Sequence, residues 1–414
     1  MKIFVLNCGS SSVKYKLYQM HPETLLAEGK VERIGEDDAE LKHVAHAVPG
    51  SGKTVIRKQT ILEHRSAIQT VLDLLTHPEH GVIQNAGEIG VAGHRVVHGG
   101  EHFSDSVQVD SDVKRLLSEL NELAPLHNPH NIEGISAAEE VLPGVPNVAV
   151  FDTAFHATIP RYAHLYAVPY LLYERHRIRR YGFHGTSHKY VSRRAAELMG
   201  RPYEELRIIS CHLGNGASVA AIAGGRSVDT SMGFTPLEGL IMGTRSGDVD
   251  PGMLFYVMAK EDLGLGEVDA MLNKHSGVFG ISGLGDMREV EDAAARGDQR
   301  ALLAFEMYEY RVRKYIGAYT AAMDGVDAMV FTAGVGENSP RLRSAICSHL
   351  AYLGVTLDPV RNERAGGERE ITTPGSPVKV FVIPTNEELV IAREAMAVIA
   401  RSRPQTGSLH EVHS

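Results

Sequence analysis

Two arginines lie in glycine-rich segments, where a guanidinium group can reach an anion. Arg245 lies in MGTRSGDVDP, between Gly243 and Gly247, and Arg95 lies in HRVVHGG. The guanidinium fork matches the oxygens of carboxylates and phosphates. A structural salt bridge is the ordinary role of a single arginine. Together with the glycine loops elsewhere in the chain, however, the two arginines indicate a site of phosphoryl transfer.

Three loops of small residues each follow a short apolar segment. They occur in VLNCGSSSVKY, CHLGNGAS and FTAGVGENS. Residues without a Cβ let successive backbone N–H groups converge on phosphate oxygens. Glycine and serine also form ordinary hairpin turns, so one such loop would mean little. Three of them, each after an apolar strand, predict phosphate binding.

Oxygen ligands for a metal ion follow two of the predicted strands. Asp152 ends VAVFD, at the carboxyl end of a strand, where α/β proteins place functional carboxylates; its alternative role is to cap the next turn. After VKVFVIPTN, Thr385 and Glu388 fit a capping box, which leaves Glu387 as the metal candidate. Asn7 ends the first strand and would orient a metal-bound water. We expect Mg²⁺, with Mn²⁺ as an alternative, because ATP chemistry needs a hard cation.

Three histidine pairs raise the alternative of a zinc site in a metallohydrolase. The pairs are His94/His98, His127/His130 and His184/His188. The chain has no HExxH segment, and we expect the pairs in glycine- or proline-containing loops rather than on one helical face. Structural or substrate-contacting histidines are therefore favoured over zinc ligands.

Short β-branched segments alternate with helical patterns, which predicts an α/β fold. The predicted strands span 3–7, 13–18, 88–97, 147–151, 206–212, 217–223, 328–332 and 378–383. The predicted helices span 61–75, 112–123, 132–141, 187–198, 300–323, 340–350 and 387–401. Segments 3–17 and 208–222 repeat one strand–turn–strand plan, so we expect two similar domains facing one another across a nucleotide cleft.

Composition limits the classes of partner. A chain of 414 residues with 43% hydrophobic residues is long enough for two cores. Lys and Arg number 42 against 51 Asp and Glu, a net charge of −9, which argues against nucleic-acid or anionic-membrane partners. No apolar segment approaches the ~20 residues of a membrane span, so we expect a cytoplasmic protein. Three unevenly spaced cysteines predict free thiols.

Several long segments of this sequence resemble those of the acetokinase family, in the actin-like, sugar-kinase and heat-shock ATPase superfamily. The similarity covers nearly all of the chain except the tail and runs through NCGSSSVKY, HRVVHGG, FDTAFH, RRYGFHGTSH, CHLGNGAS, DTSMGFTPLEGLIMGTRSGDVDP, FTAGVGEN and PTNEE. The resemblance implies two duplicated actin-like (ribonuclease H-like) domains. It also implies reversible, Mg²⁺-dependent, in-line transfer of the ATP γ-phosphoryl group to acetate, giving acetyl phosphate and ADP.

The resemblance also implies roles for individual residues. Arg95 and Arg245 would bind acetate and the transferred phosphoryl group, and His184 would donate to that group. Asn7, Asp152 and Glu387 would organise the metal. The acetate methyl group would be enclosed by Val97, Leu126, Phe183 and Pro236. The nucleotide contacts would be Ser10, Ser12, Lys14, His212, Asn215, Gly216, Asp286, Met287, Arg288, Gly334, Gly336 and Asn338.

Elementary chemistry supports this assignment. A carboxylate acceptor is ionised at neutral pH, so Asp152 need not act as a general base, and cations are needed because acceptor and triphosphate repel one another. A propionate or butyrate kinase is the nearest alternative, since one methylene is worth only ~1–3 kcal/mol. An ATPase that drives a conformational switch in a partner is a second alternative.

One segment departs from the family pattern. ISGLGDMRE, in the expected adenosine pocket, is one residue shorter than usual and has Met287 where an aromatic residue is common. Met287 can still cover an adenine face, but GTP and pyrophosphate stay open as donors. The expected domains are 1–152 completed by 389–402, and 153–388, which would bind nucleotide. The resemblance implies a homodimer formed through the second of these domains. Residues 403–414 are expected to be a mobile tail.

Overall fold

The computed structural model describes residues 1–46, 52–125 and 127–402. The chain forms two compact units, one of Met1–Ala154 together with the chain from Glu388 onward, the other of Phe155–Glu387. Leu126 and the tail 403–414 lie outside the described residues. Because each unit has its own sheet and its own core, each is described by itself.

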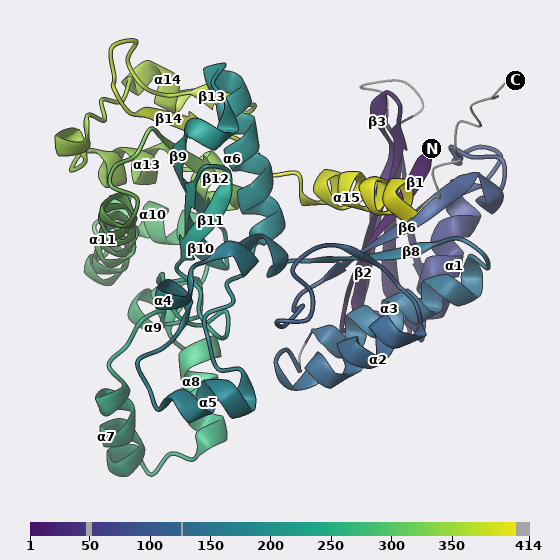
Figure 1. Cartoon of the computed structure of the whole chain (residues 1–414), viewed down its shortest axis with the longest axis horizontal. Helices are drawn as coiled ribbons and strands as arrows, with labels where there is room; N and C mark the ends of the chain where they lie inside the picture. Colours follow the sequence, from purple (N-terminus) through teal and green to yellow (C-terminus); the bar gives the residue numbers. More distant parts are fainter. Residues whose placement is uncertain (47–51, 126, 403–414) are drawn as a thin grey trace, which may run out of the picture. The chain divides into compact units, whose positions relative to one another are not determined.

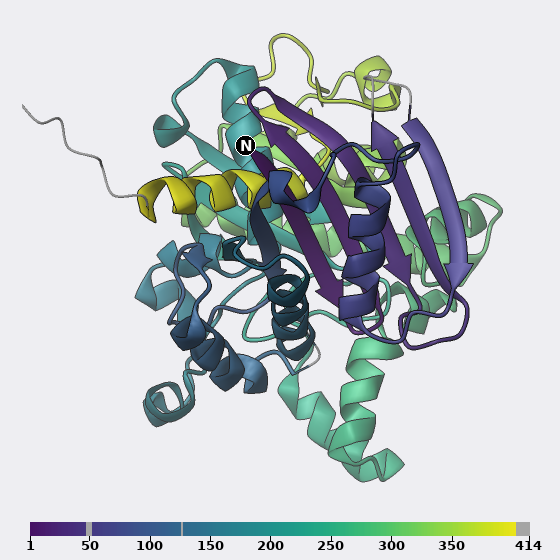
Figure 2. The same cartoon turned by 90° about the vertical axis from the view of Figure 1, so that its right-hand side faces the viewer.

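The first unit contains an eight-stranded sheet in the order β5-β4-β3-β2-β1-β6-β8-β7 (Figures 1 and 2). Its strands are β1 (Lys2–Gly9), β2 (Ser12–Met20), β3 (Glu23–Glu32), β4 (Ala39–His46), β5 (Gly52–Gln59), β6 (Ile89–Val96), β7 (Val107–Gln108) and β8 (Asn147–Phe151). Strands β1 to β5 form an antiparallel meander. Strand β6 is parallel to β1, and β8 is parallel to β6.

Helices cover both faces of this sheet. They are α1 (His64–Leu75), α2 (Ser111–Glu119), α3 (Asn128–Val141) and α15 (Glu387–Ser402). Successive residues of β1 point to opposite faces, so Phe4 and Leu6 share a core with α1 and α3, while Ile3 and Val5 share one with α15. Gly93 lets α15 approach closely, because a Cβ there would lie 2.9 Å from Ile391 Cγ2.

The second unit contains a six-stranded sheet in the order β11-β10-β9-β12-β14-β13. Its strands are β9 (Arg207–Leu213), β10 (Ala217–Ala223), β11 (Arg226–Thr230), β12 (Ala328–Thr332), β13 (Arg369–Glu370) and β14 (Lys379–Val382). The order β11-β10-β9-β12-β14 repeats β3-β2-β1-β6-β8, with an antiparallel meander followed by two parallel strands in both units. The predicted α/β class and the duplication are therefore confirmed.

The helices of the second unit include two that pack on its sheet, α6 and α11 (Figure 1). In chain order the helices are α4 (Arg161–His164), α5 (Tyr170–His176), α6 (Gly185–Met199), α7 (Pro251–Glu261), α8 (Leu265–Lys274), α9 (Gly277–Ser282), α10 (Met287–Ala295), α11 (Gln299–Ala322), α12 (Ala333–Asn338), α13 (Pro340–Cys347) and α14 (Pro359–Glu363). Short 3₁₀ turns span Ala86–Glu88, Leu120–Glu122, Ala154–Thr158, Tyr203–Glu205 and Ala351–Leu353. Among the described helices, none combines the length and apolar character of a membrane span.

The strands that were predicted most accurately are those whose residues are almost all buried. The strands predicted at 147–151, 217–223 and 328–332 are confirmed to the residue as β8, β10 and β12. Strands β3, β4 and β5 were not predicted, because charged residues interrupt their apolar positions; in the ladder Lys30 pairs with both Lys14 and Lys42. The segment 251–295, where no helix was predicted, holds α7 to α10.

Buried histidines should make the protein sensitive to mild acid. Burial lowers the pKa of His94, His98 and His156 to about 4, against about 6.5 in an unfolded chain. Between these values the unfolded chain binds more protons, so stability present above about pH 6.5 is lost as the pH falls toward 4. Calorimetry should show the unfolding midpoint falling across that window, less steeply in His94→Gln. A flat midpoint would contradict this reading.

Candidate functional site

Three of the predicted site residues meet in the first unit. Arg95 donates from Nε and Nη2 to the carboxylate of Asp152, at 3.2 and 3.1 Å from Nε and 2.6 Å from Nη2. Arg95 Nη1 also donates to Asn7 Oδ1 at 3.4 Å. The Asp152 side chain is 1% exposed, while that of Arg95 is 26% exposed. A buried carboxylate therefore fixes a guanidinium group that keeps some access to solvent.

The parallel strands bring these three residues together. Asn7 lies near the end of β1, Arg95 near the end of β6, and Asp152 directly after β8. These strands are neighbours in the sheet, and Asp152 N donates to Val96 O at 3.0 Å. Because parallel strands present their carboxyl ends at one edge, residues from distant parts of the sequence share that edge.

Two buried asparagines on α3 hold the backbone around this group, and the sequence did not reveal them. Asn131 accepts from Val97 N at 3.1 Å and donates to Cys8 O at 2.8 Å. Asn128 accepts from His98 N at 3.2 Å and donates to His98 O at 3.1 Å. Asn131 thus joins the end of β1 to the segment after β6. A polar side chain on a helix signals a surface position, and only packing shows that these two are buried.

The first predicted phosphate loop is the hairpin between β1 and β2. Gly9 pairs with Ser12 in the ladder, so Ser10 and Ser11 form its turn. Asn7 pairs with Lys14, and residues directly opposite one another project from the same face. The Gly9 carbonyl accepts from His64 Nε2 at 2.7 Å. The fold therefore brings Asn7 and Lys14 together and anchors the turn that carries Ser10.

In the second unit, His184 and Arg245 meet at Gly216. A Cβ on Gly216 would lie 3.7 Å from Arg245 Nη1 and 3.7 Å from both Cε1 and Nε2 of His184. Arg245 Nη1 donates to Pro236 O at 3.4 Å and lies 3.9 Å from Met242 Sδ. Burial lowers the pKa of Arg245. Within the described residues Arg245 has no carboxylate partner, so its charge is available to an anion.

His184 is held by the first turn of α6. It adopts a left-handed backbone conformation, φ 57°, as the N-cap of that helix, a conformation that histidine adopts more readily than most residues. Its ring stacks on His212 at 4.1 Å between centroids, with an interplanar angle of 18°. His212 Nδ1 is 2.8 Å from Ser187 Oγ. The preceding residue, Phe183, is buried, and its carbonyl accepts from His156 Nε2 at 3.0 Å.

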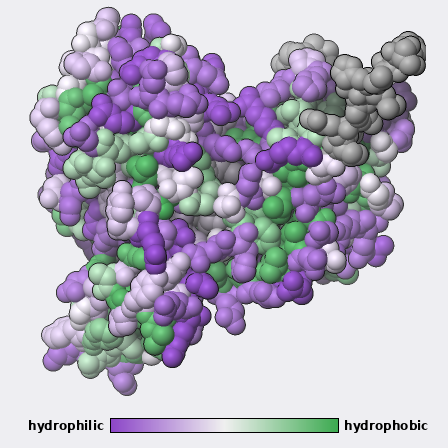
Figure 3. Space-filling model, viewed as in Figure 1, coloured by the Kyte–Doolittle hydropathy of each residue, from purple (hydrophilic) through white to green (hydrophobic). Residues whose placement is uncertain are grey.

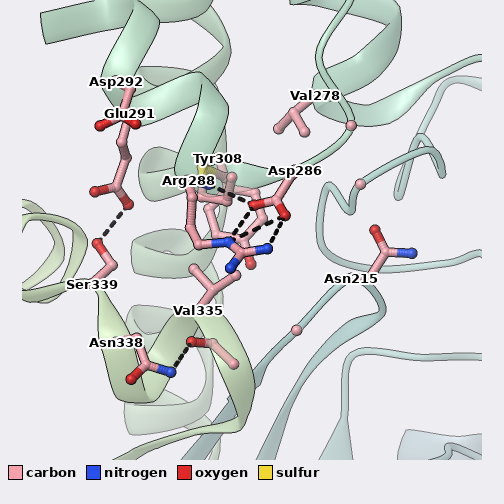
Figure 4. Close-up of a pocket in the computed structure, with 15 residues that line it drawn as sticks. Asn215, Val278, Asp286, Arg288, Glu291, Asp292, Tyr308, Val335, Asn338 and Ser339 are labelled. Atoms are coloured by element: carbon pink, nitrogen blue, oxygen red, sulfur yellow. Dashed lines mark hydrogen bonds and ion pairs between the residues drawn. The ribbon is translucent and has the colours of Figure 1, made fainter.

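A cavity of about 790 Å³ lies in the second unit (Figure 4). Six predicted nucleotide residues line it: Asn215, Asp286, Met287, Arg288, Gly334 and Asn338. Asp286 is the N-cap of α10, and its carboxylate binds Arg288 Nε at 3.0 Å and Nη2 at 2.5 Å. Gly336 does not line the cavity; it packs against β9, and its carbonyl accepts from Arg343 Nη1 at 2.8 Å.

The cavity also contains residues that the sequence did not indicate. They are Gly214, Gly243, Val278, Gly285, Glu291, Asp292, Tyr308, Val335 and Ser339. Ser339 Oγ donates to Glu291 Oε1 at 2.5 Å, and burial raises the pKa of Glu291 (Figure 4). Glu291 and Asp292 follow Arg288 by three and four residues, the spacing of one helical face. Predicting α10 would have revealed them.

Glu387, the expected metal ligand, accepts from Thr186 Oγ1 at 3.1 Å. The capping box expected of Thr385 and Glu388 is wrong. Thr385 Oγ1 has no hydrogen-bond partner among the described residues, and Glu388 instead pairs with Lys16 at 3.2 Å. Taken separately, the Asn7 amide and the Glu387 carboxylate each offer a hard oxygen donor of the kind that Mg²⁺ prefers. No group of three or more His, Cys, Asp or Glu side chains in the described part of the chain is placed to hold a metal ion.

The loop position expected for the histidine pairs is wrong for several members. His94 lies in β6, His130 in α3 and His188 in α6. His94 Nε2 lies 2.7 Å from Asn147 Oδ1, and both ring nitrogens of His188 bind serine hydroxyls. The three cysteines are free and buried, as predicted for free thiols. Burial raises the pKa of Cys8 and of Cys347 to about 12.

Both the sequence and the structure of this chain match those of known proteins over nearly their full length. The model of the acetokinase family matches residues 2–393. An acetate kinase of Symbiobacterium thermophilum is 60% identical over 400 residues, 96% of this chain and 99% of that protein. The crystal structure of Porphyromonas gingivalis acetate kinase matches with a TM-score of 0.92 and 48% identity, over 96% of this chain and 99% of that one. A propionate kinase of Francisella tularensis matches with a TM-score of 0.88 and 42% identity, over 96% and 99% of the two chains.

Proposed function

Because the chain belongs to the acetokinase family, as its sequence predicted, we propose that it transfers the γ-phosphoryl group of ATP to acetate. The products are acetyl phosphate and ADP, and the reaction is reversible. One observation carries the proposal: His184 and a half-buried Arg245, which has no carboxylate partner within the described residues, lie beside the same glycine of a phosphate-type loop. This pair supplies donors and positive charge to a transferred phosphoryl group.

The site needs cations rather than a base. Acetate is ionised at neutral pH, so its oxygen attacks phosphorus without losing a proton. The barrier arises from repulsion between the acetate and the triphosphate, and from charge on the equatorial oxygens in the transition state. Arg245 and His184 stabilise that charge. Asp152, whose carboxylate is bound by Arg95, holds a guanidinium group in place and does not act as a base.

The cluster of Asn7, Arg95 and Asp152 in the first unit binds the acceptor and the metal. Arg95 binds the acetate carboxylate, and Val97, Phe183 and Pro236 contact its methyl group. Asn7 and Glu387 would hold the metal, and Asp152 would help to organise it. The metal, Mg²⁺ or Mn²⁺, would supply positive charge that offsets the charge of the phosphates. Both donors are hard oxygens, which supports the choice of metal.

The nucleotide base and ribose occupy the cavity of the second unit. Its lining by Asp286, Met287 and Arg288 supports this part of the proposal. The phosphates lie toward the glycine loops, near Asn215, Gly216, Gly334 and His212. Ser10, Ser12 and Lys14, on the first hairpin, contact the phosphates as well.

A propionate kinase is the second candidate, because the Francisella tularensis propionate kinase matches this chain with 42% identity. The test measures ADP release and hydroxamate formation with acetate, propionate and butyrate, each with ATP, GTP or pyrophosphate. We expect the largest kcat/KM with acetate and ATP. ATP turnover without any acid would instead identify a switch ATPase. EDTA should abolish activity, Mg²⁺ or Mn²⁺ should restore it, and stoichiometric bound zinc would overturn the assignment.

We also propose a homodimer formed through the second unit. None of the residues of α7 is buried, although it contains Met253, Phe255 and Tyr256. Apolar residues gather around α7 and α8 at the lower left of Figure 3. An apolar surface of this kind favours association.

We also propose a cytoplasmic location, which the three free cysteines support.

Phe255→Asp should convert the dimer to a monomer, because it places a charge in the buried interface. Val360→Asp is the matched control, since Val360 and Phe255 are both 73% exposed apolar residues of the second unit. Light scattering should give twice the chain mass of 45.1 kDa for the unmodified protein and the control, and a lower mass for Phe255→Asp. A monomeric unmodified protein would refute the proposal.

A further inference from the structure

A chain of buried hydroxyl and imidazole groups leads to His184 from the core of the second unit. Ser210 Oγ lies 2.9 Å from His188 Nδ1, and His188 Nε2 lies 2.8 Å from Ser218 Oγ. Ser218 Oγ in turn lies 2.9 Å from His184 Nδ1. Ser210, His188 and Ser218 are fully buried. Three hydrogen bonds thus connect four side chains from β9, β10 and the start of α6.

The number of protons available in this series of side chains limits the direction in which the three hydrogen bonds can donate. Burial lowers the pKa of His188 well below its ordinary value, so His188 is neutral and carries one N–H. Ser210, His188 and Ser218 then hold three protons for three hydrogen bonds. Among the described residues, the partners of Ser218 Oγ are the nitrogens of His188 and His184. The Ser218 proton therefore has an acceptor only if the bonds all run toward His184 or all run away from it.

Ser210 distinguishes the two directions. Among the described residues, His188 Nδ1 is the one hydrogen-bond partner of Ser210 Oγ. If the bonds ran away from His184, His188 would donate to Ser210, and the Ser210 proton would have no acceptor in the core. An unsatisfied buried donor costs about 1–3 kcal/mol. The favoured direction therefore runs from Ser210 to His188, then to Ser218, and ends with Ser218 donating to His184 Nδ1.

We propose that Ser218 is a positioning residue that keeps the proton of neutral His184 on Nε2. This inference rests on the proposed role of His184. A neutral imidazole that accepts at Nδ1 must carry its proton on the other nitrogen. Nε2 is one of the two His184 atoms next to Gly216, on the side where Arg245 Nη1 lies. Ser218 thereby makes His184 a donor, not an acceptor, toward a phosphoryl oxygen.

The main test is a double-mutant cycle between Ser218→Ala and His184→Ala. Removing one preorganised donor costs about 10²–10³-fold in kcat, so His184→Ala should lose about that much. Ser218→Ala should lower kcat about 10- to 100-fold with little change in KM, because the tautomer and ring orientation are no longer fixed. In the His184→Ala background, Ser218→Ala should cause no further loss, because Ser218 acts through His184.

Ser227→Ala is the matched control. Ser227 is also fully buried, and its Oγ lies 2.8 Å from Nδ1 of another buried histidine, His156. We expect this variant to lose stability similar to that lost by Ser218→Ala while keeping kcat within about twofold. Ser218→Thr, which keeps the hydroxyl, should recover most of the activity lost in Ser218→Ala. ¹⁵N spectra of labelled histidine should show the Nε2–H tautomer of His184 in the unmodified protein and a mixture in Ser218→Ala.

The outcomes separate this inference from the proposed function. Full activity in His184→Ala would remove the role of His184 itself. If His184→Ala is impaired but Ser218→Ala is not, or if the two losses multiply, the positioning role of Ser218 is wrong. An Nδ1–H tautomer of His184 in the unmodified protein would also overturn it. If Ser218→Ala fails to fold, Ser218→Thr and the ¹⁵N spectrum of the unmodified protein still decide the question.

Discussion

Arg245→Ala should lower kcat by about 10³-fold or more, the effect of removing an arginine that stabilises a transferred phosphoryl group. The residue has no carboxylate partner within the described residues, so its loss leaves no buried anion behind. The unfolding midpoint should therefore change little. Acyl-phosphate formation and calorimetry on the same preparation measure both effects.

Two further variants sharpen this test. Arg245→Lys keeps the charge but loses the planar fork, so it should recover only part of the activity. Arg311→Ala is the matched control, because Arg311 lies in the same unit but pairs with Asp248 at 3.5 Å and donates to Gly239 O at 3.0 Å. It should lose stability and keep most of its kcat. Near-normal turnover in Arg245→Ala would refute the proposed role.

Arg95→Ala should lose both activity and stability, for different reasons. Acetate loses its guanidinium partner, so kcat/KM for acetate should fall by about 10²-fold or more. The buried Asp152 carboxylate also loses its partner, and breaking such a pair costs about 3 kcal/mol. For a unit of this size, that cost lowers the unfolding midpoint by about 6–12 °C.

A second substitution separates the two effects. In Arg95→Ala/Asp152→Asn the buried charge is removed, so most of the lost stability should return while activity stays low. Calorimetry and acetate-dependent ADP release measure the two quantities. Recovery of activity together with stability would show that Arg95 acts only as a structural partner of Asp152. If Arg95→Ala alone were as stable as the unmodified protein, the expected loss of stability from an unpaired Asp152 carboxylate would be wrong.

The local elements were predictable where one pattern dominates the sequence. Strand β10 was predicted to the residue because ASVAAIA is continuously apolar apart from one serine, and that serine is Ser218. Strands β3 to β5 were missed because charged residues interrupt their apolar positions, and because β3 buries few residues and β5 none among its described side chains. Helix α7 was missed because its apolar residues form one continuous segment, 253–258, in which none is fully buried, so no amphipathic pattern identifies the helix.

The sequence by itself determined the chemistry of the loops, the family and the duplicated α/β plan, because glycine spacing and strand periodicity are local properties of the chain. Tertiary structure alone decided which groups are partners. Three contacts join residues that are far apart in sequence. Arg95 pairs with Asp152, His184 and Arg245 lie together at Gly216, and Asn131 forms hydrogen bonds with the backbone of both Cys8 and Val97. Such contacts depend on strand order and on burial, which no short segment of sequence encodes.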